Sequence, residues 1–460
     1  MSTSTVINRA QILKEKFRLC LGLPLRELLP ESRIEQVVKE LGLKYRNRLF
    51  NPVVTVWTFL LQVLDVDKSC HNAVSRVVAW LSSEKVEIPS TDTSAYCQAR
   101  KRLPEKLLQK LFEETGENLE ATVNPSSLWC GRHVQLIDCS TVSMPDTAEN
   151  QQAYPQSGKQ KEGCGFPLAK IGVLFSLATG AAFALAIDIL NTNDIKLVRR
   201  LYQFLKPLDV LLGDSAFCSY ADFFWLQQRG CDAVVRKHNG RCQRLQGGVF
   251  VAKNDKIVTW HKPKTCPRGL TKEEFSALPK TQKIREIFYS IEQPGFRTQS
   301  VSLLTTLLDI DAFTPTALTQ LYRSRWDVEL DLKHLKTSLG MDILRSKTPD
   351  GVRKEIYAFL LAYNLLRNLM CEAGTTYSSP PLRLSLQGTR HLLYNFIPQF
   401  LSVCAPRRSQ IYLTLLKVIV HKLVPYRPGR VEPRVTKRRP KAYPSMPQPR
   451  SLLRQQLLAT

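Results

Sequence analysis

The chain has 460 residues, which is enough for two to four domains and a large hydrophobic core. Its 65 Lys and Arg residues outnumber 40 Asp and Glu residues, so the formal net charge is +25. A hydrophobic content of 43% excludes a disordered basic tail protein and a collagen-like chain. So large a positive excess indicates a polyanionic partner, and nucleic acid is the simplest one.

Membrane, secretion and zinc signals are weak. The polar start lacks the apolar core of a secretory signal. Residues 171–190 are long enough to span a membrane, but a central Thr-Gly pair and the internal Asp188 favour two buried strands joined by a turn. The nearest two of the 12 cysteines, Cys130 and Cys139, are nine positions apart, so there is no C-x-x-C pair. We expect a cytoplasmic protein with reduced thiols, no zinc and no membrane contact.

Residues 1–125 predict helices throughout, because apolar runs such as 53–64 and 73–81 alternate with charged stretches without strand-like periodicity. One of these helices carries Arg100 and Arg102. Arginine side chains can hold DNA phosphates or read base edges, although a solvated basic helix face is an equally good interpretation. We expect residues 1–125 to form an N-terminal helical DNA-binding domain.

Residues 126–236 have a different pattern. Short apolar runs predict strands, and these runs lie at 133–138, 169–178, 181–190 and 209–214. A helical pattern covers 194–205, between the third and fourth of these runs. Strands and a helix in this order indicate an α/β sheet.

Three further segments follow. Residues 237–305 are polar, contain glycine and include four strand-like pieces, so we expect a β-rich insertion. Helical patterns return in 306–375 and continue into 376–460, a C-terminal helical region with a basic tail. The tail contains Arg438 and Arg439, which we expect to contact nucleic acid; a solubilising tail is the alternative.

Two aspartates stand at the ends of predicted strands. Asp138 ends the run 133–138, and Asp214 ends the run 209–214. In α/β folds the carboxyl ends of strands form the edge where functional sites lie. Each aspartate alone has a simpler explanation as a turn or helix cap. Two of them in one α/β unit favour a functional site.

A third carboxylate comes from a predicted helix at 322–336. At about 100° per residue, four polar side chains fall within roughly 60° of arc beside an apolar stripe, namely Tyr322, Arg325, Glu329 and Lys336. An ordinary exposed helix face gives similar stripes. However, phosphodiester chemistry with two Mg²⁺ ions needs two or three carboxylates, with cations nearby to hold phosphates.

The spacing Tyr322-x2-Arg325-x3-Glu329-x6-Lys336 resembles the Y-R-E-K signature of bacterial DDE transposases of the insertion-sequence-four family. The similarity extends over most of the chain. It includes 94–104, 137–156, 163–167, 211–223, 304–309, 321–330, 334–356, 362–370 and 433–444.

The resemblance implies an RNase H-like catalytic core. Residues 126–236 would form its first part and residues 306–375, with the glutamate helix, its second part, separated by the insertion 237–305. The catalytic and metal-binding triad would be Asp138, Asp214 and Glu329, and the residues on DNA phosphates would be Tyr322, Arg325 and Lys336.

The same resemblance implies cut-and-paste DNA transposition. The protein would bind the terminal inverted repeats of an insertion sequence, cleave the strands with Mg²⁺ (or Mn²⁺ as a substitute), and join them to target DNA. It would act as a homodimer on double-stranded DNA at the bacterial nucleoid. Two alternatives stay open: a catalytically inactive protein that binds the element's ends, and an RNase H-like DNA nuclease.

Overall fold

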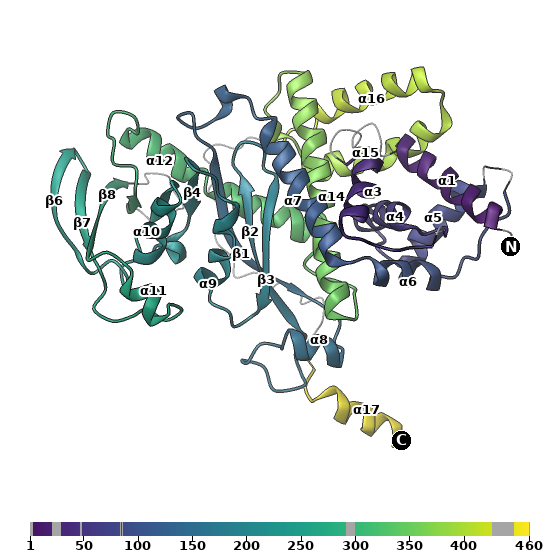
Figure 1. Cartoon of the computed structure of the whole chain (residues 1–460), viewed down its shortest axis with the longest axis horizontal. Coiled ribbons are helices and arrows are strands. Elements are labelled where there is room, and N and C mark those ends of the chain that lie inside the picture. The colour runs from purple at the N-terminus through teal and green to yellow at the C-terminus, as the bar shows by residue number, and fades with distance from the viewer. Residues whose placement is uncertain are drawn as a thin grey trace.

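In this computed structural model, the described residues are 3–20, 29–46, 48–82, 84, 86–290, 300–425 and 446–459. They form one mixed sheet of nine strands with helices packed against it (Figure 1). The strands are β1 (Val134–Ser143), β2 (Leu168–Ser176), β3 (Ala182–Ile189), β4 (Val210–Gly213), β5 (Asp232–Arg236), β6 (Leu245–Ala252), β7 (Asp255–His261), β8 (Thr281–Ser290) and β9 (Ser300–Thr305). This confirms the predicted mixed α/β fold.

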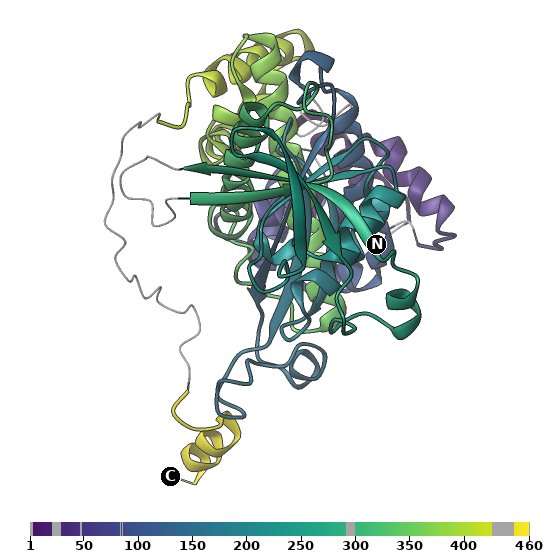
Figure 2. The same ribbon diagram turned by 90° about the vertical axis from the view of Figure 1, so that its left-hand side faces the viewer.

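The order across the sheet is β3-β2-β1-β4-β5-β9-β8-β7-β6. Strands β1, β4 and β5 are parallel neighbours, and β2 and β3 continue the sheet antiparallel on one side. On the other side β5 pairs antiparallel with β9, and β8, β7 and β6 follow. The segment 237–305, expected as an insertion, therefore extends the core sheet. Figure 2 shows the strands fanned by the usual twist.

The apolar stretch 171–190 contributes most of β2 and all of β3, joined at Gly180, whose φ is +67°. The two-strand interpretation is thus confirmed. In the described part of the chain, no helix is long and apolar enough to cross a membrane.

Helices make up the described part of residues 1–125, as predicted. They are α1 (Thr3–Cys20), α3 (Glu31–Glu40), α4 (Pro52–Leu64), α5 (Cys70–Ser82), α6 (Ser94–Arg102) and α7 (Glu105–Ala121). The start of α4 illustrates the local cause: the Asn51 side chain accepts a hydrogen bond from the Val54 amide, and Pro52 occupies the first helical position. In Figure 1 the helices α1, α3, α4, α5 and α6 lie at the opposite end of the molecule from β6, β7 and β8, and α7 lies between them and the sheet.

The remaining helices lie beside or beyond the sheet. They are α8 (Ala148–Ala153), α9 (Asp194–Arg199), α10 (Tyr220–Gln228), α11 (Lys272–Ser276), α12 (Pro315–Arg323), α13 (Trp326–Lys333), α14 (Pro349–Thr376), α15 (Leu386–Ser402), α16 (Ala405–Val420) and α17 (Arg450–Leu458). Figures 1 and 2 place α17 at the far side of the molecule from α16.

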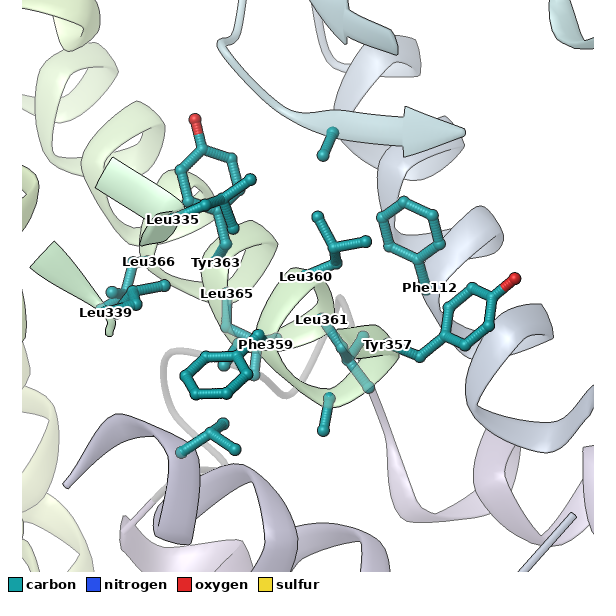
Figure 3. Close-up of a cluster of buried hydrophobic side chains, with 14 of the residues drawn as sticks. Phe112, Leu335, Leu339, Tyr357, Phe359, Leu360, Leu361, Tyr363, Leu365 and Leu366 are labelled. Carbon is teal, nitrogen blue, oxygen red and sulfur yellow. The ribbon is translucent and has the colours of Figure 1, made fainter. Parts of the chain in front are cut away.

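The long helix α14 joins the N-terminal helices to the sheet, because it packs against α4, α7, α16 and β3. Figure 3 shows its apolar side chains meeting those of α7, where the rings of Phe112 and Tyr357 lie 5.9 Å apart. Helix α7 in turn approaches β3 so closely that a Cβ at Gly116 would lie 2.6 Å from Phe183 Cβ. Each large apolar side chain buried there contributes about 1.5–3 kcal/mol, so α14 holds the two halves of the molecule together.

Candidate active site

Asp138 and Asp214 lie at the same level on adjacent strands. Strands β1 and β4 are parallel, and Leu136 stands opposite Leu212. Two residues further along each strand, Asp138 and Asp214 come to the same level and, by the alternation of side chains, the same face of the sheet. The predicted meeting of these two carboxylates at one sheet edge agrees with this register.

The two aspartates differ in where their strands end. Asp214 directly follows β4, as predicted, and its Oδ1 accepts a 2.7 Å hydrogen bond from the Ala216 amide. Asp138, in contrast, does not end its strand. Strand β1 continues to Ser143 because β2 pairs with it as far as Ser143 and Leu168. The prediction of a strand end at Asp138 was therefore wrong, since an apolar run marks only the buried part of a strand.

Glu329 reaches this face from α13, which packs against β1. Arg325, one helical turn earlier, lies 3.0 Å from Glu329 through Nη2 and Oε1. The Glu329 side chain is 49% exposed and the Arg325 side chain 9%. The Arg325 guanidinium also lies 4.2 Å from the centre of the Trp326 ring. Glu329 is thus a surface carboxylate beside a buried cation.

The pKa of Asp138 shows that the three carboxylates share one electrostatic environment. The pKa of Asp138 is raised to about 6, mainly by burial and in smaller part by the negative charges of Asp214 and Glu329, while a hydrogen bond from Cys139 N and the charge of Arg325 act in the opposite direction. A buried carboxylate surrounded by like charges is stabilised by a bound cation.

The donor set fits a divalent metal ion. Three carboxylates provide hard oxygen ligands, which Mg²⁺ and Mn²⁺ prefer. As the side chains stand, no three His, Cys, Asp or Glu side chains of the described residues already surround a common point. Glu329 instead forms an ion pair with Arg325.

The helix predicted at 322–336 is divided in three. Helix α12 ends at Arg323, α13 begins at Trp326, and a wider π-helical turn follows at His334–Ser338. Around the break, Ser324 and Arg325 donate tighter bonds to carbonyls three residues earlier. Wide turns of this kind are common at functional sites. The prediction of one regular helix was wrong here, because periodicity does not reveal such local rewinding.

Lys336 lies in this wide turn and still reaches the site: its Nζ is 3.0 Å from Ser140 Oγ. Ser140 is two residues after Asp138 and so on the same face of β1. Tyr322 is buried, which raises its pKa to about 12, and the Arg325 and Arg236 charges act on it in the opposite direction. Tyr322, Arg325, Glu329 and Lys336 therefore border one region, as their spacing predicted.

Arg236 also borders this region, and sequence reasoning missed it. It is the last residue of β5, and its Nη2 lies 3.3 Å from Ser215 Oγ, next to Asp214. Its signal in the sequence was an exposed cation at the end of a short apolar strand. A strand end of this kind can place a basic residue at the site as well as an aspartate.

Arg100 and Arg102, the basic pair of α6, have different surroundings. The Arg100 guanidinium lies 3.9 Å from the centre of the Phe59 ring, and its Nη1 is 3.3 Å from Gln62 Oε1. This inward packing argues against Arg100 as a DNA contact. Arg102 is exposed and lines a cavity of about 340 Å³ together with Arg46. The predicted contacts Arg438 and Arg439 lie outside the described residues.

Comparisons with known proteins support one family. The family described as "Transposase DDE domain" matches residues 129–365, and the family described as "Insertion element 4 transposase N-terminal" matches residues 22–113. Transposase InsG for insertion sequence element IS4 of Escherichia coli is 24% identical over 433 residues, which are 92% of this chain and 93% of that protein.

More distant similarities point the same way. A putative transposase for insertion sequence element IS4SA of Synechocystis is 24% identical over 216 residues, which are 46% of this chain and 57% of that protein. The piggyBac transposase in a synaptic complex with hairpin DNA has a TM-score of 0.40 and 11% identity over 90% of this chain and 86% of that one. A TM-score this low does not bear on the fold.

Proposed function

Because the chain belongs to the transposase DDE domain family, we propose that Asp138, Asp214 and Glu329 are its three catalytic carboxylates. The chain is a DNA transposase, a metal-dependent enzyme that cleaves DNA strands and transfers them to new sites. The observation that carries the residue assignment is the register of the parallel strands β1 and β4, which brings Asp138 and Asp214 to the same level, together with the packing of α13, the helix of Glu329, against β1. The three residues come from a β-strand, a strand end and a helix, so only the folded protein would bring them together around a metal ion.

We also propose how the chain is divided into domains around these carboxylates. Residues 126–236 and 306–375 would form the two parts of an RNase H-like core, with 237–305 as an insertion that lengthens its sheet. Residues 1–125 would form the DNA-binding domain and 376–460 the C-terminal region. The parallel pairing of β1 with β4, and the packing of α13 on β1, support this division.

The carboxylates would hold Mg²⁺, with Mn²⁺ as a substitute. A divalent metal ion supplies a Lewis acid, which activates water and then a 3′-hydroxyl and offsets charge on the reacting phosphate. The protein's own contribution is electrostatic and positional. Asp138 sits where burial and like charges favour proton uptake in the metal-free protein. When DNA binds, Arg325 would leave its ion pair with Glu329 and pair with a DNA phosphate instead.

Cations around the carboxylates would hold the DNA backbone. Lys336 is oriented by Ser140, which is two residues after Asp138 on β1, so its charge would stay near the carboxylates. Arg325 and Tyr322 would contact the neighbouring phosphates, and Arg102, Arg438 and Arg439 would bind DNA further away. The DNA would be the element's inverted repeats and the target duplex, which two protomers would bring together as a homodimer at the nucleoid.

A cleavage assay tests this proposal. The substrate is a duplex carrying the inverted repeat that brackets the gene, with its flanking DNA, incubated with purified protein in Mg²⁺ or in chelator. We expect Mg²⁺-dependent cleavage at the repeat boundary followed by joining to a target plasmid. Asp138→Asn, Asp214→Asn and Glu329→Gln should lose both reactions while their DNA affinity stays within about threefold of wild type.

The same assay separates the two alternatives. An inactive end-binding protein would bind the repeat with no cleavage by the wild type. An RNase H-like nuclease would cut without preference for the repeat boundary and would join no ends to the plasmid. Full cleavage by Glu329→Gln would refute the carboxylate assignment.

A further inference from the structure

A basic cleft lies on the other side of the sheet from the three carboxylates. Its volume is about 1000 Å³, and its walls come from α9, the start of α10, the segment 240–244 and the segment 261–269. Helix α9 contacts β1 and covers the face that bears Ile137 and Cys139, since Leu197 of α9 belongs to the same buried cluster as Ile137 and lies near Cys139. Asp138 belongs to the opposite face. The cleft is therefore separate from the candidate active site.

The lining is strongly positive. Six of its 17 residues are Lys or Arg and none is Asp or Glu: Lys196, Arg199, Arg241, Arg244, Lys264 and Arg268. In the part of the chain that the structure describes, Arg199 alone of the six pairs with a carboxylate, that of the buried Asp222. Among the described residues no carboxylate forms an ion pair with the other five. Such a cluster repels itself unless an anion binds between its members.

Three of these arginines are fixed in place by backbone carbonyls. Arg241 Nη1 lies 2.6 Å from Ala216 O, Arg199 Nη1 lies 2.9 Å from Gly269 O, and Arg244 bonds to Lys262 O. A carbonyl orients a guanidinium without cancelling its charge. The cleft thus presents ordered positive charge, which lowers the entropy lost when phosphates bind.

Arg241 also connects the cleft to the active-site edge. Its partner Ala216 is two residues after Asp214, whose side chain caps the same turn. A DNA backbone that leaves the carboxylates at Asp214 can pass around this edge and enter the cleft. Because phosphates repeat at short intervals, a chain of them can occupy several cations at once.

We propose that this cleft binds the phosphate backbone of a second stretch of DNA, beyond the phosphates held at the carboxylates. The inference rests on the proposed function, which supplies DNA as the ligand. The second stretch is either the flanking DNA that continues past the cleavage site or the target duplex. Both present the same phosphodiester backbone, so the experiment distinguishes them.

The test measures DNA affinity against salt concentration, in chelator, so that no catalysis is needed. The triple variant Lys196→Gln/Lys264→Gln/Arg268→Gln removes three exposed charges that no described carboxylate neutralises. The slope of log Kobs against log salt concentration is negative, and each lost phosphate contact makes it shallower by about 0.9. For the triple variant we expect a slope that is shallower by about 2–3.

A matched control loses the same charge elsewhere. It neutralises three exposed lysines that lie outside the proposed DNA-binding domain 1–125 and do not line the cleft: Lys206, Lys417 and Lys422. We expect its slope to change by less than about 1. Equal slopes for the two triple variants on every DNA would overturn the proposal.

Three DNA probes identify the source. The first is a duplex of the terminal repeat cut at its boundary, the second is the same repeat with 20 flanking base pairs, and the third is an unrelated duplex representing target DNA. A slope change confined to the second probe assigns the cleft to flanking DNA. A change confined to the third, or common to the second and third, assigns it to target or general duplex. These results concern binding alone, so failed cleavage by the wild type would refute the proposed function separately.

A natural cysteine gives a measurement without a variant in the cleft. Cys266 is exposed between the lining residues Thr265 and Pro267, whereas the exposed Cys404 precedes α16. We expect the bound duplex to slow alkylation of Cys266 by N-ethylmaleimide at least fivefold, read by peptide mass spectrometry, and to leave Cys404 unchanged. Equal alkylation of Cys266 with and without saturating DNA would contradict the proposal.

Discussion

Asp331, two residues after Glu329, forms a buried ion pair with Arg367 of α14. The Tyr363 hydroxyl joins them, 3.0 Å from Asp331 Oδ1 and 2.7 Å from the carbonyl oxygen of Gly180. This network ties α13 to α14 and to the turn between β2 and β3. It lies under the helix that carries Glu329, so it positions that helix without belonging to the candidate active site.

Removing Asp331 should destabilise the protein strongly. In Asp331→Ala the guanidinium of Arg367, which is 3% exposed as a side chain, loses its partner charge. Breaking a buried pair in this way costs about 3–5 kcal/mol. The expected result is a lower midpoint of unfolding in urea, followed by tryptophan fluorescence. An unchanged midpoint would show that the pair does not hold α13 in place.

Removing the charge of the neighbouring acid Asp327 should stabilise the protein, in contrast to the loss of Asp331. Its pKa is raised to about 6, mainly by burial and in smaller part by the charge of Asp331. A raised carboxyl pKa means that ionisation costs stability, with the full cost present above pH 6 and absent below about pH 4. The thermal midpoint of Asp327→Asn should therefore be higher than that of the wild type at pH 7.5. The two midpoints should be equal at pH 4.

The metal-free stability of Asp138 variants should depend on pH in the same direction. Burial raises the pKa of Asp138 to about 6, so its ionisation destabilises the metal-free protein by about 1–3 kcal/mol above that pH. Asp138→Asn should melt higher than wild type in chelator at pH 7.5. Addition of about 10 mM Mg²⁺ should then raise the thermal midpoint of the wild type but not that of Asp138→Asn. An equal rise of the midpoint in both proteins would contradict metal binding at Asp138.

The sequence predicted the local elements of this site well. Strand β4 ends where the apolar run ends, so Asp214 could be placed correctly before the structure was known. The end of β1 could not, because its last five residues are mostly polar and are held by pairing with β2. An apolar pattern reports burial, whereas the length of a strand also depends on its neighbour.

Long-range pairing was beyond the sequence. The residues that join β5 to β9, such as Val234 and Thr305, are far apart in the chain, and nothing local specifies their pairing. The inward turn of Arg100 was also hidden, because it depends on Phe59 of another helix. The break between α12 and α13 was hidden for another reason, because a helical period does not reveal a local change of winding. Pairing and packing between distant residues are not contained in any local pattern.

The contribution of Lys336 should be separable from its support by Ser140. Lys336→Ala removes a cation beside Asp138, so we expect weaker binding of end DNA and a salt slope reduced by about 1. Ser140→Ala removes the 3.0 Å contact but keeps the charge, so its salt slope should equal that of wild type. Fluorescence anisotropy at several salt concentrations measures both, and equal slopes for all three proteins would exclude Lys336 as a phosphate contact.

Arg100 and Arg102 provide a second pair with opposite outcomes. Because Arg100 stacks on Phe59, Arg100→Ala should lower stability by about 2 kcal/mol through the lost cation–π contact and packing. Arg102 is exposed, so Arg102→Ala should leave the thermal midpoint within about 1 °C of wild type and weaken DNA binding two- to tenfold. Thermal shift and anisotropy on the same preparations decide between them. The reverse result, with Arg102 needed for stability and Arg100 for DNA alone, would show that α6 presents its other face to DNA.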